Sequence, residues 1–584
     1  MDRSRTKLVC TIGPASAERI GDLVAAGMDV ARINFSHGTP DDHRAYVHAV
    51  RAAAHSARRS VAVMVDLPGP KIRLAELEGG VVTLETGATF TLWPESEPEA
   101  GRERAAPAEA PDPAEAPEPA EPTAPAEAPE PAEPTAPAEP TAVTEAAEAP
   151  EPAEPTTPAE APESADTTDA PIELDEPTEA LPHEAVASDD VDDTTGSAME
   201  VSEPTHEPRA LGDASGASVS TSGLASVLQV GDRVLLADGA AELRVTAIVG
   251  SAVETEVIHG GTVRSRSGVN IPSSRLTGDG LTDDDRTVIP RALELRADLI
   301  AQSFVRSADD VRSLRALLPA DGPRVVAKIE TRAAVDNFAE IAQAADGIMV
   351  ARGDLGVDIP FEEVPIVQKD LIRAAADADR FSIVATQMLE SMTSAPRPTR
   401  AEASDVANAV LDGADAVMLS AETAIGTYPL EALQAMARIC CATEAERGAS
   451  YDSADEEQVS AATAVVLAAS VMTGQTDVGA IWCFTRTGHT AEMLSMTRPG
   501  VPIVAFTLSP IVARRLAVRR GVIPMILPAG GKAEPLIERM ETAWRSQKDR
   551  ATYETVILVT TSQQPTGINR FEVHRLSGPG ASPK

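Results

Sequence analysis

Two stretches decide the fold: Arg324-Val-Val-Ala-Lys328-Ile-Glu330 and, after it, Gly347-Ile-Met-Val-Ala-Arg-Gly353-Asp354. The chain has seven lysines in 584 residues, so a lysine within an apolar run is poorly explained as a surface charge. Strand side chains alternate, which places Lys328 and Glu330 on the same side, and a neighbouring parallel strand can bring Asp354 close. A cation beside two carboxylates suits a divalent metal and an anionic substrate; a purely structural ion pair is the alternative.

These stretches belong to a series of eight short apolar runs, most of them separated by segments with helical periodicity. Eight strands that alternate with helices predict an α/β fold, a (β/α)8 TIM barrel. The runs are residues 7–13, 30–35, 61–67, 299–305, 324–330, 347–352, 381–388 and 416–420, with helices expected at 308–318, 335–344 and 365–379.

The gap between the third and fourth runs is too long for one helix. Alternating patterns at 81–92 and 227–257, with Gly-Asp and Asp-Gly turns, predict a small β domain inserted there. Four further runs, at 478–485, 501–507, 522–527 and 554–560, predict a C-terminal α/β domain. The expected divisions are 1–74 and 271–440 for the barrel, 75–270 for the inserted β domain and 441–584 for the C-terminal domain.

The inserted β domain is itself interrupted by low-complexity sequence at about 94–222. A twelve-residue repeat occupies 113–124 and 125–136, and the segment holds 24 of the 46 prolines. Few large apolar groups are available to offset the entropy of ordering, so we expect this segment to be disordered. It is either a passively tolerated insertion or a segment that binds a partner or regulates the enzyme.

The net charge of −40 arises mainly in that segment, where 34 acidic residues face three arginines and account for −31. The remaining −9 offers no basic surface for nucleic acid or an anionic membrane. Cys10, Cys440, Cys441 and Cys483 lack metal-binding spacing, and two of them are adjacent, which favours reduced thiols. With no export signal and no long apolar run, we expect a cytoplasmic protein.

Polar residues mark the ends of the predicted barrel strands, where such barrels hold their active sites. Arg32, Asn34 and Ser36 alternate and therefore share one face of the second strand. Asp66 and Thr386 end two other strands. A guanidinium beside neutral oxygens suits an anionic ligand, although Asn34 and Ser36 can also simply fix a loop.

Several segments, in this order, resemble the pyruvate kinase family. They cover nearly everything outside 94–222. The resemblance implies that the inserted domain at 75–270 is a small, mobile β-barrel lid on the TIM barrel. It also implies that 441–584 is a C-terminal α/β regulatory domain, usually in a homotetramer with effector sites in or near that last domain. The segments are residues 5–16, 27–38 (ending Arg32-Ile-Asn34-Phe-Ser36-His37-Gly), 66–73 (Asp66-Leu-Pro-Gly-Pro-Lys71-Ile-Arg73), 260–272, 385–392, 396–423 and 571–575.

The resemblance also implies residue roles in transferring a phosphoryl group from phosphoenolpyruvate to ADP, with pyruvate and ATP as products. Glu330 and Asp354 would bind Mg²⁺ or Mn²⁺ together with substrate oxygens, and Lys328 would neutralise the transferring group, which fits a reaction catalysed by positioning and charge. Arg32 would bind the substrate phosphate. Gly353 and Thr386 would contact the substrate, with Thr386 near the face where the enolate becomes a ketone. Asn34, His37 and Arg73 would contact the nucleotide, and Arg266 loosely matches lid lysines of relatives.

Four positions depart from the family pattern. Leu67, Pro68 and Ala421 replace a threonine, a lysine and a glycine, and Lys71 replaces the glutamate of potassium-dependent relatives. The residue types at Asn34, Ser36 and Asp66, with the Leu67 carbonyl, still permit a K⁺ site. Because the Lys71 ammonium can balance the same negative charge, we expect activity without added K⁺.

Two other functions were weighed. A metal-dependent lyase or aldolase acting on pyruvate enolate would need neither the lid nor Arg32 and Arg73. A non-catalytic interaction protein acting through the acidic segment is disfavoured by the intact set of Lys328, Glu330 and Asp354. The sequence does not identify an allosteric effector.

Overall fold

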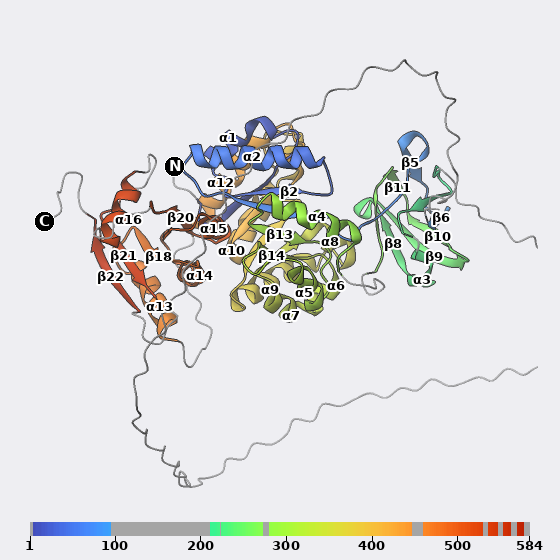
Figure 1. Ribbon diagram of the computed structural model, residues 1–584. Helices are drawn as coiled ribbons and strands as arrows, with labels where there is room; N and C mark the ends of the chain where they lie inside the picture. The colour runs from blue at the N-terminus through green and yellow to red at the C-terminus, as the bar shows by residue number, and fades with distance from the viewer. Residues whose placement is uncertain are drawn as a thin grey trace, which may run out of the picture. The chain divides into compact units, whose positions relative to one another are not determined.

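The computed structural model describes residues 4–94, 211–221, 223–272, 280–446, 460–528, 535–546, 553–561 and 569–576. Its centre is a closed barrel of eight parallel strands (Figure 1). In order around the barrel these are β1 (Lys7–Thr11), β17 (Ala416–Leu419), β16 (Phe381–Ala385), β15 (Gly347–Ala351), β14 (Arg324–Ile329), β13 (Leu299–Gln302), β3 (Ala62–Asp66) and β2 (Val30–Asn34). All eight predicted strands are confirmed, as is the TIM barrel.

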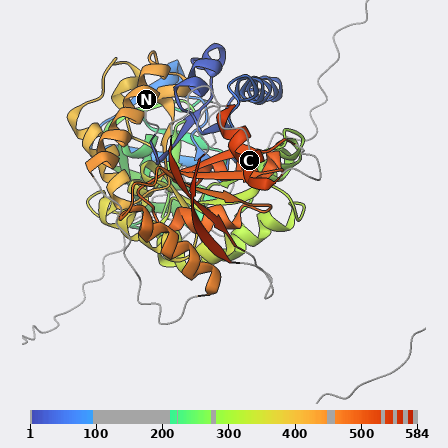
Figure 2. The ribbon, with the colours of Figure 1, turned by 90° about the vertical axis from the view of Figure 1, so that its left-hand side faces the viewer.

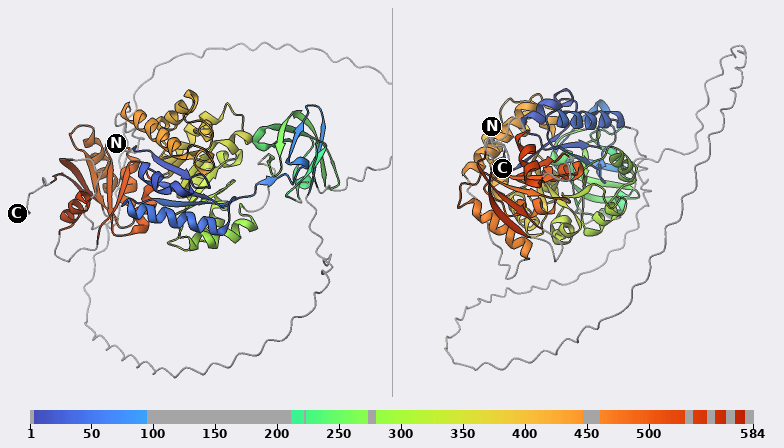
Figure 3. Two further views of the ribbon diagram at one scale, coloured as in Figure 1. Left: turned by 90° about the horizontal axis from the view of Figure 1, so that it is seen from above. Right: turned by 60° about the vertical axis from the view of Figure 1, so that its left-hand side comes forward.

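Helices surround the barrel because each carries an apolar stripe toward the strands. In the view from above, the two blue helices α1 and α2 lie along its outer surface (Figure 3). The helices of this ring are α1 (Ile20–Ala26), α2 (Pro40–Ser56), α4 (Asp283–Glu294), α5 (Ala308–Ala316), α6 (Arg332–Asp336), α7 (Phe338–Ala344), α8 (Arg352–Asp358), α9 (Val364–Asp377), α10 (Arg400–Asp412), α11 (Ala421–Ala424) and α12 (Pro429–Glu446). Capping boxes begin α2, α4, α5 and α10, which fixes where these helices start.

The lid is a mostly antiparallel sheet with the order β4-β12-β8-β9-β10-β6-β7, beside a two-stranded sheet of β5 and β11. A β-bridge between Leu74, which follows β4, and Val219 of β7 joins the two ends of the seven-stranded sheet, so this sheet closes on itself as predicted. Its elements are β4 (Ile72–Arg73), β5 (Val81–Leu84), β6 (Thr89–Pro94), β7 (Gly216–Val219), α3 (Leu224–Val227), β8 (Arg233–Leu236), β9 (Ala241–Val249), β10 (Ala252–His259), β11 (Gly261–Arg264) and β12 (Gly268–Asn270).

The expected end of the low-complexity segment at residue 222 is wrong. Strand β7 lies before that point and pairs in parallel with β6, from Thr91 opposite Gly216 to Pro94 opposite Val219. Its alternation is too short to stand out beside the polar sequence that precedes it. The rest of the segment, residues 95–210, lies outside the described residues.

The C-terminal region is a five-stranded sheet with helices on both faces (Figure 2). Four of its strands were predicted; the antiparallel edge strand β22 was not, because the sequence Arg570-Phe-Glu-Val-His-Arg575 alternates with charged residues. The elements are α13 (Ala461–Thr473), β18 (Ala480–Phe484), α14 (His489–Met496), β19 (Ile503–Thr507), α15 (Pro510–Arg515), η6 (Leu516–Val518), β20 (Val522–Ile526), α16 (Leu536–Arg545), β21 (Thr555–Thr560) and β22 (Arg570–Arg575).

The short turn η6 closes the floor of the barrel. Its residues Ala517 and Val518 are buried in the same apolar cluster as the inward-facing Val9, Met64 and Val326 of three barrel strands. The C-terminal region therefore completes the barrel core at the end opposite the polar strand termini. Within the described ranges, no helix combines the length and apolar composition needed to cross a membrane.

Candidate active site

Lys328 lies at the centre of a buried charge network at the C-terminal ends of the strands. Its Nζ is 2.8 Å from Glu330 Oε1 and 3.4 Å from Asp66 Oδ1, and it donates to Ser303 Oγ at 2.8 Å. Burial alone would lower the pKa of Lys328, but Asp66 and Glu330 outweigh burial and raise the pKa above its usual value. Lys328 is therefore a permanent cation at neutral pH, and the predicted side-by-side arrangement with Glu330 is present.

Arg32 joins this network through Asp66. The guanidinium donates from Nε to Asp66 Oδ2 at 2.7 Å and from Nη1 to Thr11 Oγ1 at 3.0 Å. Burial would raise the pKa of Asp66, but the charges of Lys328 and Arg32 outweigh it and lower the pKa. Asp66 thus stays ionised and orients both cations.

Glu330 and Asp354 converge from neighbouring strands, since β14 and β15 pair in parallel up to Ile329 and Val350. Glu330 follows β14 directly, and Asp354 lies in the first turn of α8. Burial raises the pKa of Glu330, Lys328 only partly offsets this, and the nearby charge of Asp354 raises the pKa further. Two carboxylates held in mutual repulsion are a donor set that a bound cation would stabilise.

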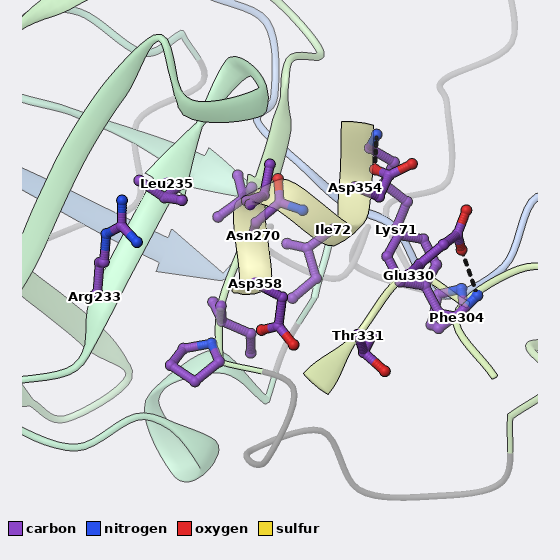
Figure 4. Close-up of a pocket in the computed structure, with 15 residues that line it drawn as sticks. Lys71, Ile72, Arg233, Leu235, Asn270, Phe304, Glu330, Thr331, Asp354 and Asp358 are labelled. Atoms are coloured by element: carbon purple, nitrogen blue, oxygen red, sulfur yellow. Dashed lines mark hydrogen bonds and ion pairs between the residues drawn. The ribbon is translucent and has the colours of Figure 1, made fainter. Parts of the chain in front are cut away.

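A cavity of about 110 Å³ opens beside these carboxylates and is lined by residues from the lid and the barrel, Lys71, Arg233, Asn270, Glu330 and Asp354 among them (Figure 4). Lys71 Nζ is 3.2 Å from Asp354 Oδ1. The lysine that replaces a family glutamate therefore contacts a predicted metal ligand rather than a surface acid.

Thr386 follows β16 in the left-handed region, with φ of 66°, a strained conformation for a β-branched residue. Its Oγ1 accepts the Gly353 N–H at 2.8 Å and donates to the Ala385 carbonyl at 2.6 Å. Arg352 secures the turn by donating to the carbonyls of Thr386 and Gln387 at 2.8 and 3.1 Å. The predicted substrate contacts Gly353 and Thr386 are thus joined directly.

The structure brings part of the predicted nucleotide set near Arg32. Burial lowers the pKa of His37, and the positive charges of Arg73, Arg32 and Lys71 lower it further, so His37 is neutral at pH 7. Arg266 lies next to Arg73, whose Nη1 donates to the Arg266 carbonyl at 3.2 Å, but the Arg266 side chain is exposed and its Nε pairs with Glu76 Oε1 at 2.8 Å. Its loose match to lid lysines stays a prediction.

The predicted K⁺ ligands lie close together but already have protein partners. Asn34 Oδ1 accepts the Ser36 N–H at 3.1 Å, and the Leu67 carbonyl accepts Ser303 Oγ at 2.9 Å. These contacts fit the alternative that Asn34 and Ser36 fix a loop.

Ser303 and Phe304 were missed from the sequence. Ser303 Oγ accepts from Lys328, and the Phe304 N–H, at a left-handed φ of 54°, donates to Glu330 Oε2 at 2.7 Å. Gly69 permits this approach, because a Cβ at that position would lie 2.6 Å from the Ser303 Cβ. The available signal was the polar pair Gln302-Ser303, which interrupts the predicted run at 299–305.

Within the described ranges, no group of three or more His, Cys, Asp or Glu side chains is arranged to hold a metal ion by itself. Glu330 and Asp354 nevertheless fit a divalent cation that takes further oxygens from a substrate. Glu330 Oε1 is buried and lies 2.8 Å from the Lys328 ammonium, while Oε2 accepts the Phe304 N–H, so the carboxylate is held in a fixed position. A hard cation prefers such carboxylate oxygens.

Comparison with known proteins agrees with this geometry. Residues 3–103 and 164–433 match the family model "Pyruvate kinase, barrel domain", and residues 463–574 match "Pyruvate kinase, alpha/beta domain". The chain is 33% identical to the pyruvate kinase of Geobacillus stearothermophilus, over 98% of this chain and 81% of that protein, and 34% identical to that of Mycobacterium intracellulare, over 98% of each. A crystal structure of a pyruvate kinase from Cryptosporidium parvum superposes with a TM-score of 0.69 at 28% identity, covering 98% of this chain and 96% of that one.

Proposed function

The chain belongs to the pyruvate kinase family and transfers the phosphoryl group of phosphoenolpyruvate to ADP, giving pyruvate and ATP, and from this premise we propose which side chains carry out the transfer. The observation that carries the proposal is the buried Lys328 ammonium, fixed between Glu330, Asp66 and Ser303. Transfer of a phosphoryl group depends mainly on placing positive charge at its equatorial oxygens. Lys328 is the group placed to do so.

Arg32 binds the substrate phosphate in this proposal. Its Nε is held by Asp66 and its Nη1 by Thr11, so the guanidinium is oriented before substrate arrives. Such preorganisation lets the charge act on the transition state without reorganisation. Lys328 and Arg32 both pair with Asp66, which fixes the distance between the two cations and lets them act on the same phosphoryl group.

Glu330 and Asp354 would hold the divalent metal that the family requires, for which we propose Mg²⁺ or Mn²⁺. When bound, the metal supplies positive charge to oxygens of the substrate. The Phe304 N–H holds Glu330 Oε2 and the Lys328 ammonium pairs with Oε1, so the carboxylate is fixed in position before a metal binds.

Thr386 would act at the face of the enolate where the ketone forms. Its hydroxyl is fixed between the Gly353 N–H and the Ala385 carbonyl, so its oxygen has a defined position at the end of β16. Gly353 contributes to the substrate site through the same hydrogen bond. Asn34, His37 and Arg73 would contact the nucleotide phosphates.

Lys71 would take the place of K⁺. Its contact with Asp354 puts a fixed positive charge beside the metal and substrate carboxylates. Such a charge provides much of the balance that a monovalent cation would supply. A K⁺ ion at Asn34, Ser36, Asp66 and the Leu67 carbonyl is then not required.

For the assembly, we propose a homotetramer and allosteric control by an effector whose identity is open. We also propose a cytoplasmic location, because Cys10, Cys440, Cys441 and Cys483 are all free thiols.

Titration of Mn²⁺ by electron paramagnetic resonance, with phosphoenolpyruvate present, tests the metal ligands. Glu330→Gln and Asp354→Asn should each weaken Mn²⁺ binding by about tenfold or more. Asp358→Asn is the matched control, since Asp358 lines the same cavity but accepts the Arg332 N–H. Equal Mn²⁺ affinity in all three variants would contradict the assignment.

A further inference from the structure

A second cavity, of about 260 Å³, lies at the opposite end of strand β14 from Lys328. Three arginines from separate elements line it: Arg315 near the end of α5, Arg324 at the start of β14 and Arg515 at the end of α15. Asp346 is the one carboxylate among the lining residues. The cavity is distinct from the active site, since the two share no lining residue.

Two of the three arginines are already paired. Arg315 Nη2 is 2.8 Å from Asp346 Oδ2, and Arg324 Nη2 pairs closely with Glu492 Oε1. Each pair uses one edge of a guanidinium, which has five N–H donors in total. The paired arginines therefore keep donor capacity toward a ligand while staying fixed in position.

Arg515 differs from them. Its Nη2 donates to the carbonyls of Asp321 and Gly322, at 2.6 and 2.5 Å, which anchors the guanidinium at the cavity wall. Its Nε is buried and has no hydrogen-bond partner among the described residues, nor does a described carboxylate form an ion pair with it. Burial and the like charge of Arg324 lower the pKa of Arg515, and the charges of Asp298, Asp346 and Asp321 offset this only in part. The guanidinium as a whole is half-buried and keeps an unused, buried Nε donor, which an anion bound in the cavity would satisfy.

We propose that this cavity binds a small phosphorylated anion, with Arg515, Arg324 and Arg315 as its ligands. Guanidinium forks match the geometry of phosphate oxygens, and three of them converge here. The cavity has room for a phosphate with a small organic group. The bound anion would join the C-terminal region to strand β14, which carries Lys328.

Calorimetric titration of the full-length protein with inorganic phosphate tests the proposal. Saturating phosphoenolpyruvate and Mg²⁺, without ADP, keep the active-site phosphate position filled. Arg515→Gln and Arg324→Gln should each lose one bound phosphate per chain, or weaken its binding about tenfold. Arg312→Gln is the control: Arg312 lies on the same helix as Arg315 but is exposed, paired with Asp309 and outside the cavity. Identical phosphate binding in Arg515→Gln and Arg312→Gln would overturn the proposal.

A third variant keeps the test decisive if an arginine variant fails to fold. Asp346→Asn removes the negative charge that competes for Arg315 while keeping an oxygen to accept the Val325 N–H. Phosphate should then bind several-fold more tightly. Unchanged or weaker binding in Asp346→Asn would contradict an anion site at this position.

Discussion

At the scale of single residues, the site depends on charges held in a dry environment. Lys328, Asp66 and Glu330 are all buried, and each would be unfavourable without the others. Removing one member leaves its partners uncompensated. In the proposed role, the Lys328 charge matters most while the phosphoryl bond breaks, so the consequences for catalysis and for folding can be separated.

We predict that Lys328→Met lowers kcat by about 10² to 10³ while changing the KM for phosphoenolpyruvate much less. Steady-state kinetics at saturating substrate, with circular dichroism to verify folding, measures this. Lys369→Met is the control, because Lys369 lies on the outer helix α9 and pairs with Asp412 of the neighbouring helix α10. Retention of more than about a tenth of wild-type turnover in Lys328→Met would exclude the proposed role.

Lys71 leads to a second prediction. Turnover of the unmutated protein in tetramethylammonium buffer should not require KCl, because the Lys71 ammonium already lies 3.2 Å from Asp354. Lys71→Glu should make turnover dependent on K⁺, since it replaces a positive charge with a negative one beside the metal carboxylates. Both proteins are assayed with and without KCl at constant ionic strength, and strong stimulation of the unmutated protein would contradict the prediction.

At the scale of elements, the sequence predicted the barrel well. The eight runs are continuous and apolar, as expected for strands buried on both faces, and polar residues directly after them locate the active site. Strands β7 and β22 were missed because one is four residues long beside polar repeats and the other is an edge strand rich in charge. Long, fully buried strands can thus be predicted from the sequence pattern, whereas the formation of an edge strand depends on the strand with which it pairs.

The same pattern explains why the site was predicted only in part. Lys328, Glu330 and Asp354 stood out as charges in or beside apolar runs. The roles of Ser303 and Phe304 depend on a left-handed turn at Phe304 and on the close approach of Gly69, which no spacing encodes. Their contacts to Lys328 and Glu330 arise only from the tertiary arrangement.

The correction at β7 gives a prediction for the acidic segment. Deleting residues 98–208 should leave the melting temperature within about 2 °C and turnover nearly unchanged, because compositional bias leaves little surface to bury. Deleting 98–218 instead should impair turnover, since it removes most of a strand that pairs with β6. Calorimetry and kinetics on both deletions distinguish the cases; a large loss of stability in the shorter deletion would show that the segment packs.

At the scale of the whole molecule, the C-terminal region contributes to the barrel itself. Ala517 and Val518 fill the barrel floor, and Arg514 donates from Nε to the buried Asp298 Oδ1 at 2.8 Å. Asp298 lies directly before β13, so the contact joins the two regions at a strand start. Stability of the barrel and of the C-terminal region should therefore be coupled.

Val518→Asp tests this coupling. An unpaired charge in the barrel floor should cost several kcal/mol and lower the melting temperature by about 10 °C. Leu508→Asp is the control, since Leu508 precedes α15 and is exposed. Equal melting temperatures for the two variants, measured by calorimetry, would show that the floor contact contributes little.

The central claim is that this site transfers a phosphoryl group from phosphoenolpyruvate to ADP. The most direct measurement is the simultaneous quantification of pyruvate and ATP formed by the purified full-length chain from phosphoenolpyruvate, ADP and Mg²⁺, with ADP or Mg²⁺ omitted in parallel. We predict equimolar pyruvate and ATP, with neither formed when ADP or Mg²⁺ is left out. Pyruvate released at the same rate without ADP, or no turnover by folded protein, would contradict the account.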